Sequence, residues 1–208
     1  MTPPTRRVPR QRRSQERLAR ITRAAGELCA EVGPAAATME AIAARAGTSI
    51  GSLYQFVPNR DALLHAVAAA YVADLDVLLD ARDEPATARL PLPALVDAVL
   101  EPFEHFHRTH PGYFAILFAP QGSDALGALR GRLRARLLAR VEALFRVRAP
   151  ALGPARRRRL ALTAVECGRA LLQYVEQSVP PAERRAMRAE LRAMLVAYLA
   201  PWLGGDER

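Results

Sequence analysis

The sequence predicts an all-α protein with a small N-terminal helical head and a larger C-terminal helical body, about nine helices in total. Apolar residues recur with helical spacing in nearly every long segment, and almost no segment alternates in the manner of a β-strand. Proline and glycine separate these segments, as helix breakers do. Half of the 208 residues are hydrophobic, so the chain has enough apolar surface to build a core.

The head is expected within residues 14–58, after a flexible basic arm. The arm, residues 1–13, contains three prolines and five arginines. The first helix of the head is expected over residues 14–32, because apolar residues keep a 3,4 spacing along it and Gly33-Pro34 then follows.

Two short helices are expected next, one from Thr38 to about Ala46 and one from about Ser49 to Val57. Gly47 lies between them and suits a left-handed helix cap. Two short helices joined by a tight glycine-containing turn are typical of a helix-turn-helix, with the earlier helix as the third member of the head.

The body is expected to extend over residues 59–208 and to combine effector binding with dimerisation. Asn59 can cap its first helix, which continues to about Leu79, and the proline-rich segment 82–93 is interpreted as a loop. Five further helical patterns follow, separated by proline or glycine: 93–109, 111–119, 124–148, 155–178 and 181–203.

Positive charge is concentrated at the N-terminal end of the chain. Residues 1–60 hold ten arginines and four glutamates, a net charge of +6, whereas residues 61–208 carry a net charge of only +3. This distribution is expected where the N-terminal end meets an anionic polymer such as nucleic acid.

Other features of the composition indicate a cytoplasmic protein. Cys29 and Cys167 lie in apolar helical patterns, where buried and reduced thiols are expected. No apolar segment follows the basic N-terminus, so we expect no signal peptide. No run of about 18 apolar residues occurs, so we expect no membrane span.

The stretch TMEAIAARAGTSIGSLYQFVPNRDALL, from Thr38 to Leu64, resembles the tetracycline-repressor (TetR) family of transcriptional regulators. The matching positions are Thr38, Ile42, Ala43, Ala46, Gly47, Ser49, Gly51, Leu53, Tyr54 and Leu63. Three positions depart from the family pattern, namely Thr48 in place of valine, Val57 in place of phenylalanine and Arg60 in place of lysine. The resemblance implies a sequence-specific DNA-binding regulator, usually a repressor that a small-molecule effector releases from its operator.

The second short helix carries side chains suited to DNA, and in a helix-turn-helix this helix enters the major groove. Ser49, Ser52 and Gln55 are polar and can face base edges, with Gln55 able to bond adenine through two hydrogen bonds. Gly51 has no side chain, so the backbone can approach DNA closely. Tyr54 can donate its hydroxyl proton to a phosphate.

Three residues outside that helix complete the predicted DNA contacts. Thr38 and Arg60 stand at helix starts, where backbone N–H groups also favour phosphate. Glu40 can accept a hydrogen bond from a cytosine amino group, although capping or repulsion is the commoner role of a carboxylate there. The arginines of the arm can follow the DNA backbone or enter a minor groove, and a solvated tail is the alternative.

A dimer on a palindromic double-stranded operator is expected, because a single head reads only a short half-site. The last two helical patterns suit this role. Residues 181–203 carry a wide apolar stripe, and residues 155–178 hold too many apolar side chains for one narrow face. The family resemblance implies the same homodimer, in which the last two helices form a four-helix bundle with those of a second subunit. Burial of both stripes within one chain is the alternative.

The aromatic-rich part of the body is the candidate site for a small apolar or amphipathic effector, because apolar walls with few polar groups form such pockets. Its candidate apolar and aromatic residues are Phe103, His107, Phe114, Leu117 and Phe118. The candidate polar contacts come from one later helix: Glu166, Arg169, Gln173 and Tyr174. An ordinary aromatic core with surface polar groups is the alternative for each residue.

We expect neither an enzyme nor a cofactor, because the sequence lacks a nucleophile elbow, a P-loop, a zincin motif and a dinucleotide fingerprint. Carboxylates and histidines crowd residues 101–110 at i,i+3 and i,i+4 spacing, but they match no defined metal signature, so we expect no metal site. An architectural DNA-binding protein that responds to no effector is the alternative function for the same head.

Overall fold

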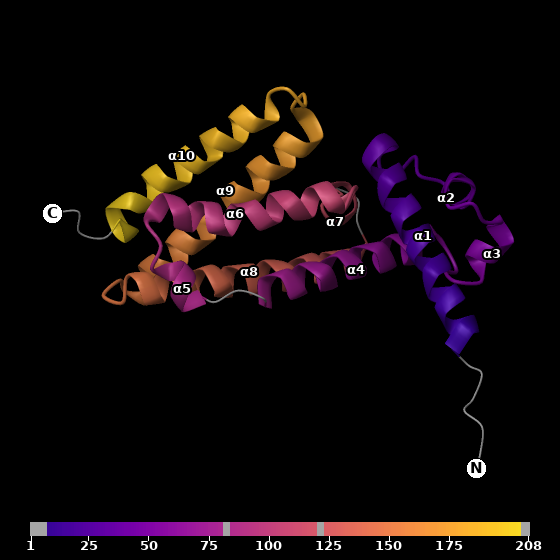
Figure 1. The fold of residues 1–208 in the computed structure, drawn as a ribbon, viewed down its shortest axis with the longest axis horizontal. Coiled ribbons are helices and arrows are strands. Elements are labelled where there is room, and N and C mark those ends of the chain that lie inside the picture. Colours follow the sequence, from indigo (N-terminus) through magenta and orange to yellow (C-terminus); the bar gives the residue numbers. More distant parts are fainter. Residues whose placement is uncertain (1–7, 81–83, 120–122, 205–208) are drawn as a thin grey trace, which may run out of the picture. The chain divides into compact units, whose positions relative to one another are not determined.

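The structure is a computed structural model that describes residues 8–80, 84–119 and 123–204, and these residues form ten α-helices and no strand (Figure 1). The all-α prediction is confirmed. In chain order the helices are α1 (Val8–Val32), α2 (Met39–Arg45), α3 (Ile50–Tyr54), α4 (Arg60–Asp80), α5 (Glu84–Ala88), α6 (Leu92–Thr109), α7 (Tyr113–Leu117), α8 (Asp124–Arg148), α9 (Pro154–Ser178) and α10 (Arg184–Leu203).

Two helix boundaries differ from the sequence prediction. α1 begins at Val8, so residues 8–13 are helical, and the prediction of a flexible arm over 1–13 is wrong for them; residues 1–7 lie outside the described part of the chain. α5 occupies part of the segment 82–93, which the sequence analysis interprets as a loop. The described residues therefore form ten helices where about nine were predicted. In both places proline stands in the first turn of the helix, where its missing N–H costs nothing.

The chain divides into two compact units, each continuous in space but not in sequence. The head unit comprises the chain up to Ala73 together with His110–Leu129, and the body unit comprises Asp74–Thr109 and Arg130 onward. The head unit therefore contains α7 and the start of α8 in addition to the helix-turn-helix. The predicted head ended at Pro58, whereas the head unit also includes the first part of α4 and the later segment with α7. The segment with α7 belongs to this unit because α7 packs against α1.

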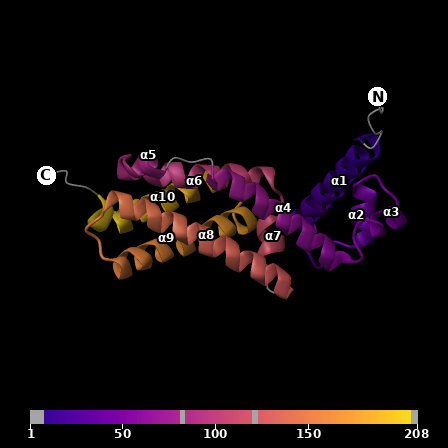
Figure 2. The same cartoon turned by 90° about the horizontal axis from the view of Figure 1, so that it is seen from below.

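The core of the head unit forms where the three N-terminal helices meet (Figure 2). Ile21 of α1, Ile42 of α2 and Leu53 of α3 are each completely buried. Asn59 caps α4 as predicted, since its Oδ1 accepts a hydrogen bond from the backbone N–H of Ala62 at 2.8 Å.

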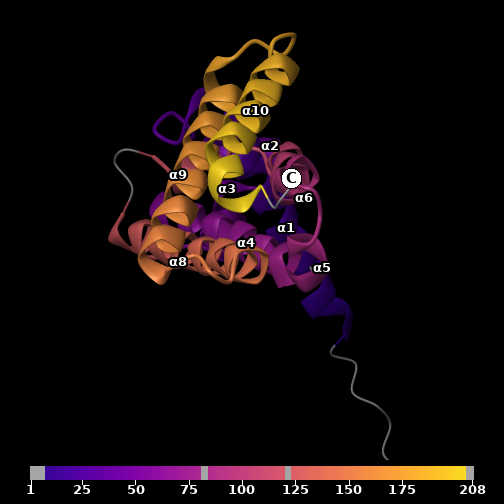
Figure 3. The ribbon, with the colours of Figure 1, turned by 90° about the vertical axis from the view of Figure 1, so that its left-hand side faces the viewer.

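The body unit is built on α9 and α10, which run side by side (Figures 1 and 3), with α6 packed against α10. Leucines at every fourth position of α10 form its buried stripe: Leu191, Leu195, Leu199 and Leu203. Arg148, the last residue of α8, donates hydrogen bonds to the carbonyl oxygens of Ala88, Leu90 and Leu203. The ends of α5, α8 and α10 therefore meet at this one side chain. Burial lowers the pKa of its guanidinium.

Of the described helices, α4 is the one that is long and apolar enough to cross a membrane by length and composition alone. The sequence analysis expected no segment of this length and composition, and α4 is the exception. Leu63, Val67 and Leu75 of α4 are completely buried, and a core helix of a globular fold has the same composition.

Candidate nucleic-acid interface

The helix-turn-helix is held in shape by side-chain caps at the start of both helices. Thr38 has extended backbone angles (φ −79°, ψ 158°), and its hydroxyl oxygen accepts a hydrogen bond from Ala41 N–H at 3.2 Å. Ser49 repeats this geometry (φ −74°, ψ 150°), accepting from Ser52 N–H at 3.2 Å. Gly47 between the helices has a φ of +62°, the left-handed conformation that glycine adopts without strain. The Thr38 cap and the Gly47 turn match the sequence prediction, whereas Ser49 was predicted only as a base contact and the structure adds its role as a cap.

The second helix of the helix-turn-helix, α3, buries one face and exposes the other. Leu53 is completely buried, and Val57, which replaces the family's phenylalanine, is only 7% exposed and keeps the position apolar. Gly51, Tyr54 and Gln55 are exposed, with 48% of Tyr54 accessible. The helix is shorter than predicted, because Gln55 ends it.

Ser52 is half-buried, and its hydroxyl oxygen accepts a hydrogen bond from Nη1 of Arg17 at 3.0 Å. Arg17 is exposed on α1 and was not among the predicted site residues. Its pairing with Ser52 spans 35 positions of sequence, and nothing in the local pattern of α1 signals it.

The other predicted DNA contacts lie around the first turns of α2 and α4. Glu40 is exposed in the first turn of α2. Arg60 begins α4 and donates from Nη1 to the carbonyl oxygen of Ala35 at 3.0 Å, while its Nε lies 4.0 Å from Asp61. Arg60 is therefore engaged with the loop before α2.

A bidentate ion pair joins α1 to α2. Both terminal nitrogens of Arg45 lie 2.6 Å from the carboxylate oxygens of Glu31. The Arg45 hydrogen bonds lower the pKa of Glu31 and raise that of Arg45, and both groups are exposed. The pair links α2 to α1 at the surface of the head unit.

The predicted effector residues belong to both compact units. Phe114 and Leu117 are buried in the head unit, where the ring of Phe114 lies 5.1 Å from Tyr113 and 5.9 Å from Phe118. Phe103 and His107 lie half-buried on α6 in the body unit. Composition indicated an aromatic-rich region, but tertiary packing divides it between the two units.

The body unit contains a small apolar cavity, with a volume of about 40 Å³, between α4, α5, α6 and α8. At about 10–15 Å³ for each water-sized group, it has room for only a few such groups. Phe103 is the one predicted effector residue that lines it. The complete lining is Leu78, Leu79, Thr87, Val99, Pro102, Phe103, Leu137, Arg140, Val141 and Leu144.

The predicted polar effector residues of α9 bond to one another. Arg169 donates from Nε to Glu166 at 3.2 Å and from Nη1 to Gln173 at 3.1 Å, and Arg134 of α8 also donates to Glu166. Burial raises the pKa of Glu166, but the hydrogen bonds from Arg134 and Arg169 outweigh it and leave that pKa below its ordinary value. These groups lie outside the cavity lining, and Tyr174 is 53% exposed.

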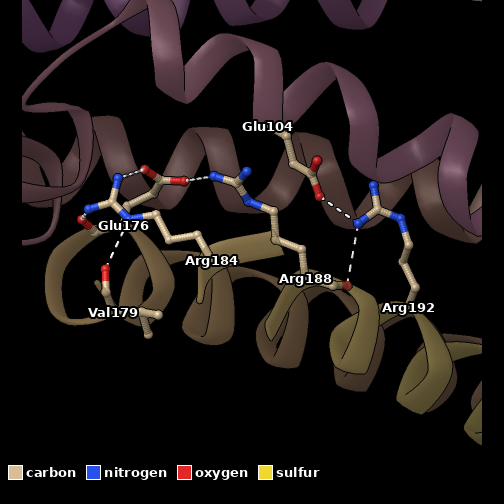
Figure 4. Close-up of polar contacts among 6 residues, drawn as sticks. All are labelled: Glu104, Glu176, Val179, Arg184, Arg188 and Arg192. Atoms are coloured by element: carbon tan, nitrogen blue, oxygen red, sulfur yellow. Dashed lines mark hydrogen bonds and ion pairs between the residues drawn. The ribbon is translucent and has the colours of Figure 1, made fainter. Parts of the chain in front are cut away.

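Arginines of α10 form ion pairs at four-residue spacing (Figure 4). Glu176 of α9 accepts from Arg184 at 3.3 Å and from Arg188. Arg184 also donates to the carbonyl oxygen of Val179, which closes the turn between α9 and α10.

Arg192, one turn further along α10, reaches two carboxylates of α6. Its Nε lies 2.7 Å from Asp97, and its Nη1 lies 2.9 Å from Glu104, which is only 8% exposed. Burial lowers the pKa of Arg192, but the bonds to Glu104 and Asp97 outweigh it and raise that pKa overall. One guanidinium thus fixes α6, which carries part of the cavity lining, against α10.

Large apolar side chains remain exposed on the last two helices. They are Tyr174 of α9 and Met194, Tyr198 and Trp202 of α10, each between 38% and 53% exposed. The guanidinium of Arg156 lies 3.9 Å from the centre of the Trp202 ring. This exposed apolar surface is hereafter called the α9–α10 face, and on α10 it flanks the leucine stripe.

Other candidate chemistry is sparse. Within residues 8–80, 84–119 and 123–204, no three metal-binding side chains cluster, including the histidines and carboxylates of 101–110. Both cysteines are free, and burial raises the pKa of Cys29 to about 11.

The chain is similar to proteins of one known family. Residues 21–67 match the model of bacterial regulatory proteins of the tetR family, and residues 91–199 match the tetracyclin repressor-like C-terminal domain. The crystal structure of a TetR-family transcriptional regulator from Streptomyces coelicolor is 27% identical, with a TM-score of 0.59, and the match covers 90% of this chain and 99% of that one. No curated protein sequence matches this chain. Because the two family models cover both its head and most of its body, the chain belongs to the TetR family of transcriptional regulators.

Proposed function

We propose that the protein is a homodimeric repressor that a small-molecule effector releases from a palindromic operator. The observation that carries this proposal is the two-faced geometry of α3. Leu53 is completely buried while Tyr54 and Gln55 point to solvent, as a helix in the major groove requires.

The polar side chains of α3 and of its two caps have roles in the proposed complex. Ser49, Ser52 and Gln55 face base edges, and Tyr54 donates to a phosphate. A Cβ on Gly51 would meet nothing within 4 Å, so the DNA backbone can approach this position closely. Thr38, Glu40 and Arg60 lie around this surface and complete the proposed DNA-binding domain, residues 14–58 with the start of α4.

The α9–α10 face supports the dimer. Four large apolar side chains exposed on two adjacent helices are unfavourable in water, and a second copy of the same face would cover them. Such a dimer carries two heads and can span two half-sites. Since its target is genomic DNA, we place the protein in the cytoplasm.

The body, residues 59–208, is the proposed effector domain, and the apolar cavity of the body unit is the starting point for a ligand. The effector acts by population shift: it binds one body conformation better, and that conformation separates the heads by a distance that no longer fits two successive major grooves. Because the cavity is small, it must widen to accept a larger ligand. An architectural protein without an effector would show no such response.

In vitro selection from a random-sequence DNA library tests DNA binding. We expect the wild-type protein to enrich one palindromic sequence and to bind it with an affinity that falls steeply with salt. The triple variant Ser52→Ala, Tyr54→Ala, Gln55→Ala should fold normally and lose the enrichment. Failure of the wild-type protein to enrich any sequence would overturn the proposal.

A thermal-shift screen of small apolar and amphipathic compounds tests the effector. A ligand that binds only the folded protein raises its apparent melting temperature, and the same compound should then weaken binding to the selected DNA. A compound that raises the melting temperature without weakening DNA binding would contradict release.

A further inference from the structure

The hydrogen bond from Arg17 to Ser52 connects α1 to the DNA-facing surface. Arg17 Nη1 lies 3.0 Å from Ser52 Oγ, and the backbone N–H of Ser52 donates to Ser49 Oγ at 3.2 Å. The hydroxyl oxygens of both serines therefore accept a hydrogen bond from the protein itself.

A serine hydroxyl has one proton to donate and two lone pairs that accept. At Ser52, one lone pair is taken by a guanidinium, which carries a full positive charge at every physiological pH. That charge repels the hydroxyl proton and turns it away from α1. It also disfavours a second donor at the same oxygen, because the donor hydrogen would approach beside the cation. The hydroxyl is left with its proton available to an outside acceptor.

We infer that Arg17 is a positioning residue for DNA recognition, which holds the Ser52 hydroxyl as a hydrogen-bond donor toward the bases. The inference rests on the proposed entry of α3 into the major groove. There, purine N7, guanine O6 and thymine O4 are acceptors, whereas cytosine presents an amino donor. Ser52 therefore selects an acceptor-bearing base on the strand that it faces and rejects cytosine.

A phosphate contact is the competing role for an exposed arginine on α1. Loss of a phosphate contact weakens binding to every sequence by a similar factor and reduces the salt dependence. Loss of a positioning contact changes the base preference at one position. The two roles therefore predict different measurements.

The test uses the full-length protein and the DNA duplex that it selects from a random library. Each base pair of one half-site is substituted in turn, and affinities are measured for wild type, Arg17→Ala, Ser52→Ala and the double variant. We expect Ser52→Ala to reduce discrimination at one position by about three- to tenfold, as loss of one hydrogen bond does. Arg17→Ala should reduce discrimination at that same position, and the double variant should lose no more than Ser52→Ala.

Arg20→Ala is the matched control, since Arg20 is also exposed on α1 and carries the same charge. It should leave the base preference unchanged. A uniform loss of affinity in Arg17→Ala, with base preference intact, would overturn the inference while leaving the proposed function in place. Failure of the wild-type protein to select any DNA would overturn both.

A second measurement changes the DNA and leaves the wild-type protein unaltered. The selected base at the Ser52 position is replaced by an analogue whose acceptor is missing or weakened while Watson–Crick pairing is kept: a 7-deaza purine, which lacks N7, or 4-thiothymine, whose sulfur is a weak acceptor. Wild-type affinity should fall about three- to tenfold, and the affinity of Ser52→Ala should not change. Selection of cytosine at that position by the wild-type protein would contradict the donor role directly.

Discussion

Gly26 of α1 and Gly112, the residue before α7, lie in backbone contact. A Cβ on Gly112 would lie 2.4 Å from the carbonyl oxygen of Gly26, and one on Gly26 would lie 2.8 Å from the carbonyl oxygen of Pro111. The hydroxyl of Tyr71 donates to that same carbonyl of Pro111 at 2.9 Å. The turn before α7 is therefore an integral part of the packing of the head unit.

Gly112→Ala is expected to lower the free energy of unfolding by about 2–4 kcal/mol, because the steric clash adds to the strain of a left-handed φ of +77°. Urea denaturation followed by circular dichroism measures this. Gly131→Ala on α8 is the control: its Cβ meets nothing within 4 Å, and alanine should stabilise the helix by about 0.5–1 kcal/mol. Equal stability of Gly112→Ala and wild type would show that α1 and the turn do not pack this closely.

Arg192→Met is expected to cost about 3 kcal/mol of stability, because it leaves the buried carboxylate of Glu104 without its counter-charge. Adding Glu104→Gln should recover part of this loss, since the neutral amide is cheaper to bury. Arg158→Met removes an exposed pair with Glu142 and should cost no more than about 0.5 kcal/mol. Equal costs for Arg192→Met and Arg158→Met would mean that the burial of Glu104 does not matter.

Met194→Glu is expected to dissociate the proposed dimer, because it places a charge on the apolar α9–α10 face. The dimer Kd should rise by about thirtyfold or more, the effect of losing an interface hot spot. Sedimentation velocity measures the shift toward monomer. Val77→Glu is the control, since Val77 is 70% exposed on α4, outside that face, and the variant should remain dimeric. A dimeric Met194→Glu protein would exclude this face as the interface.

Cys29 is expected to resist alkylation in the native protein at pH 8 and to react fully in urea, because it is completely buried and burial raises its pKa to about 11. The unfolded thiol ionises near pH 9, whereas the folded thiol stays protonated. The unfolded state is therefore favoured progressively as pH rises from about 9 to 11. Cys29→Ala should lack this component of the alkaline loss of stability. Rapid native labelling, detected by mass spectrometry, would contradict the burial.

The effector site marks the limit of prediction from the sequence. Aromatic and polar residues at helical spacing identified a region, but the rings of Phe114 and Phe118 pack within the head unit, and Glu166 and Arg169 bond to each other on α9. Only Phe103 lines the cavity of the body unit. Residue type alone does not say which helices pack together, and a cavity exists only where they do.

The sequence by itself determined the starts of α2, α3 and α4 and the chemistry of the DNA-facing helix. Thr38, Ser49 and Asn59 cap the helices that follow them through contacts spanning three residues, so a short stretch of sequence contains all of the necessary information. The tertiary structure alone decided that Arg17 bonds Ser52 and that Gly26 meets Gly112. Those contacts join residues that are distant in sequence, and only the packing of one helix on another brings them within reach.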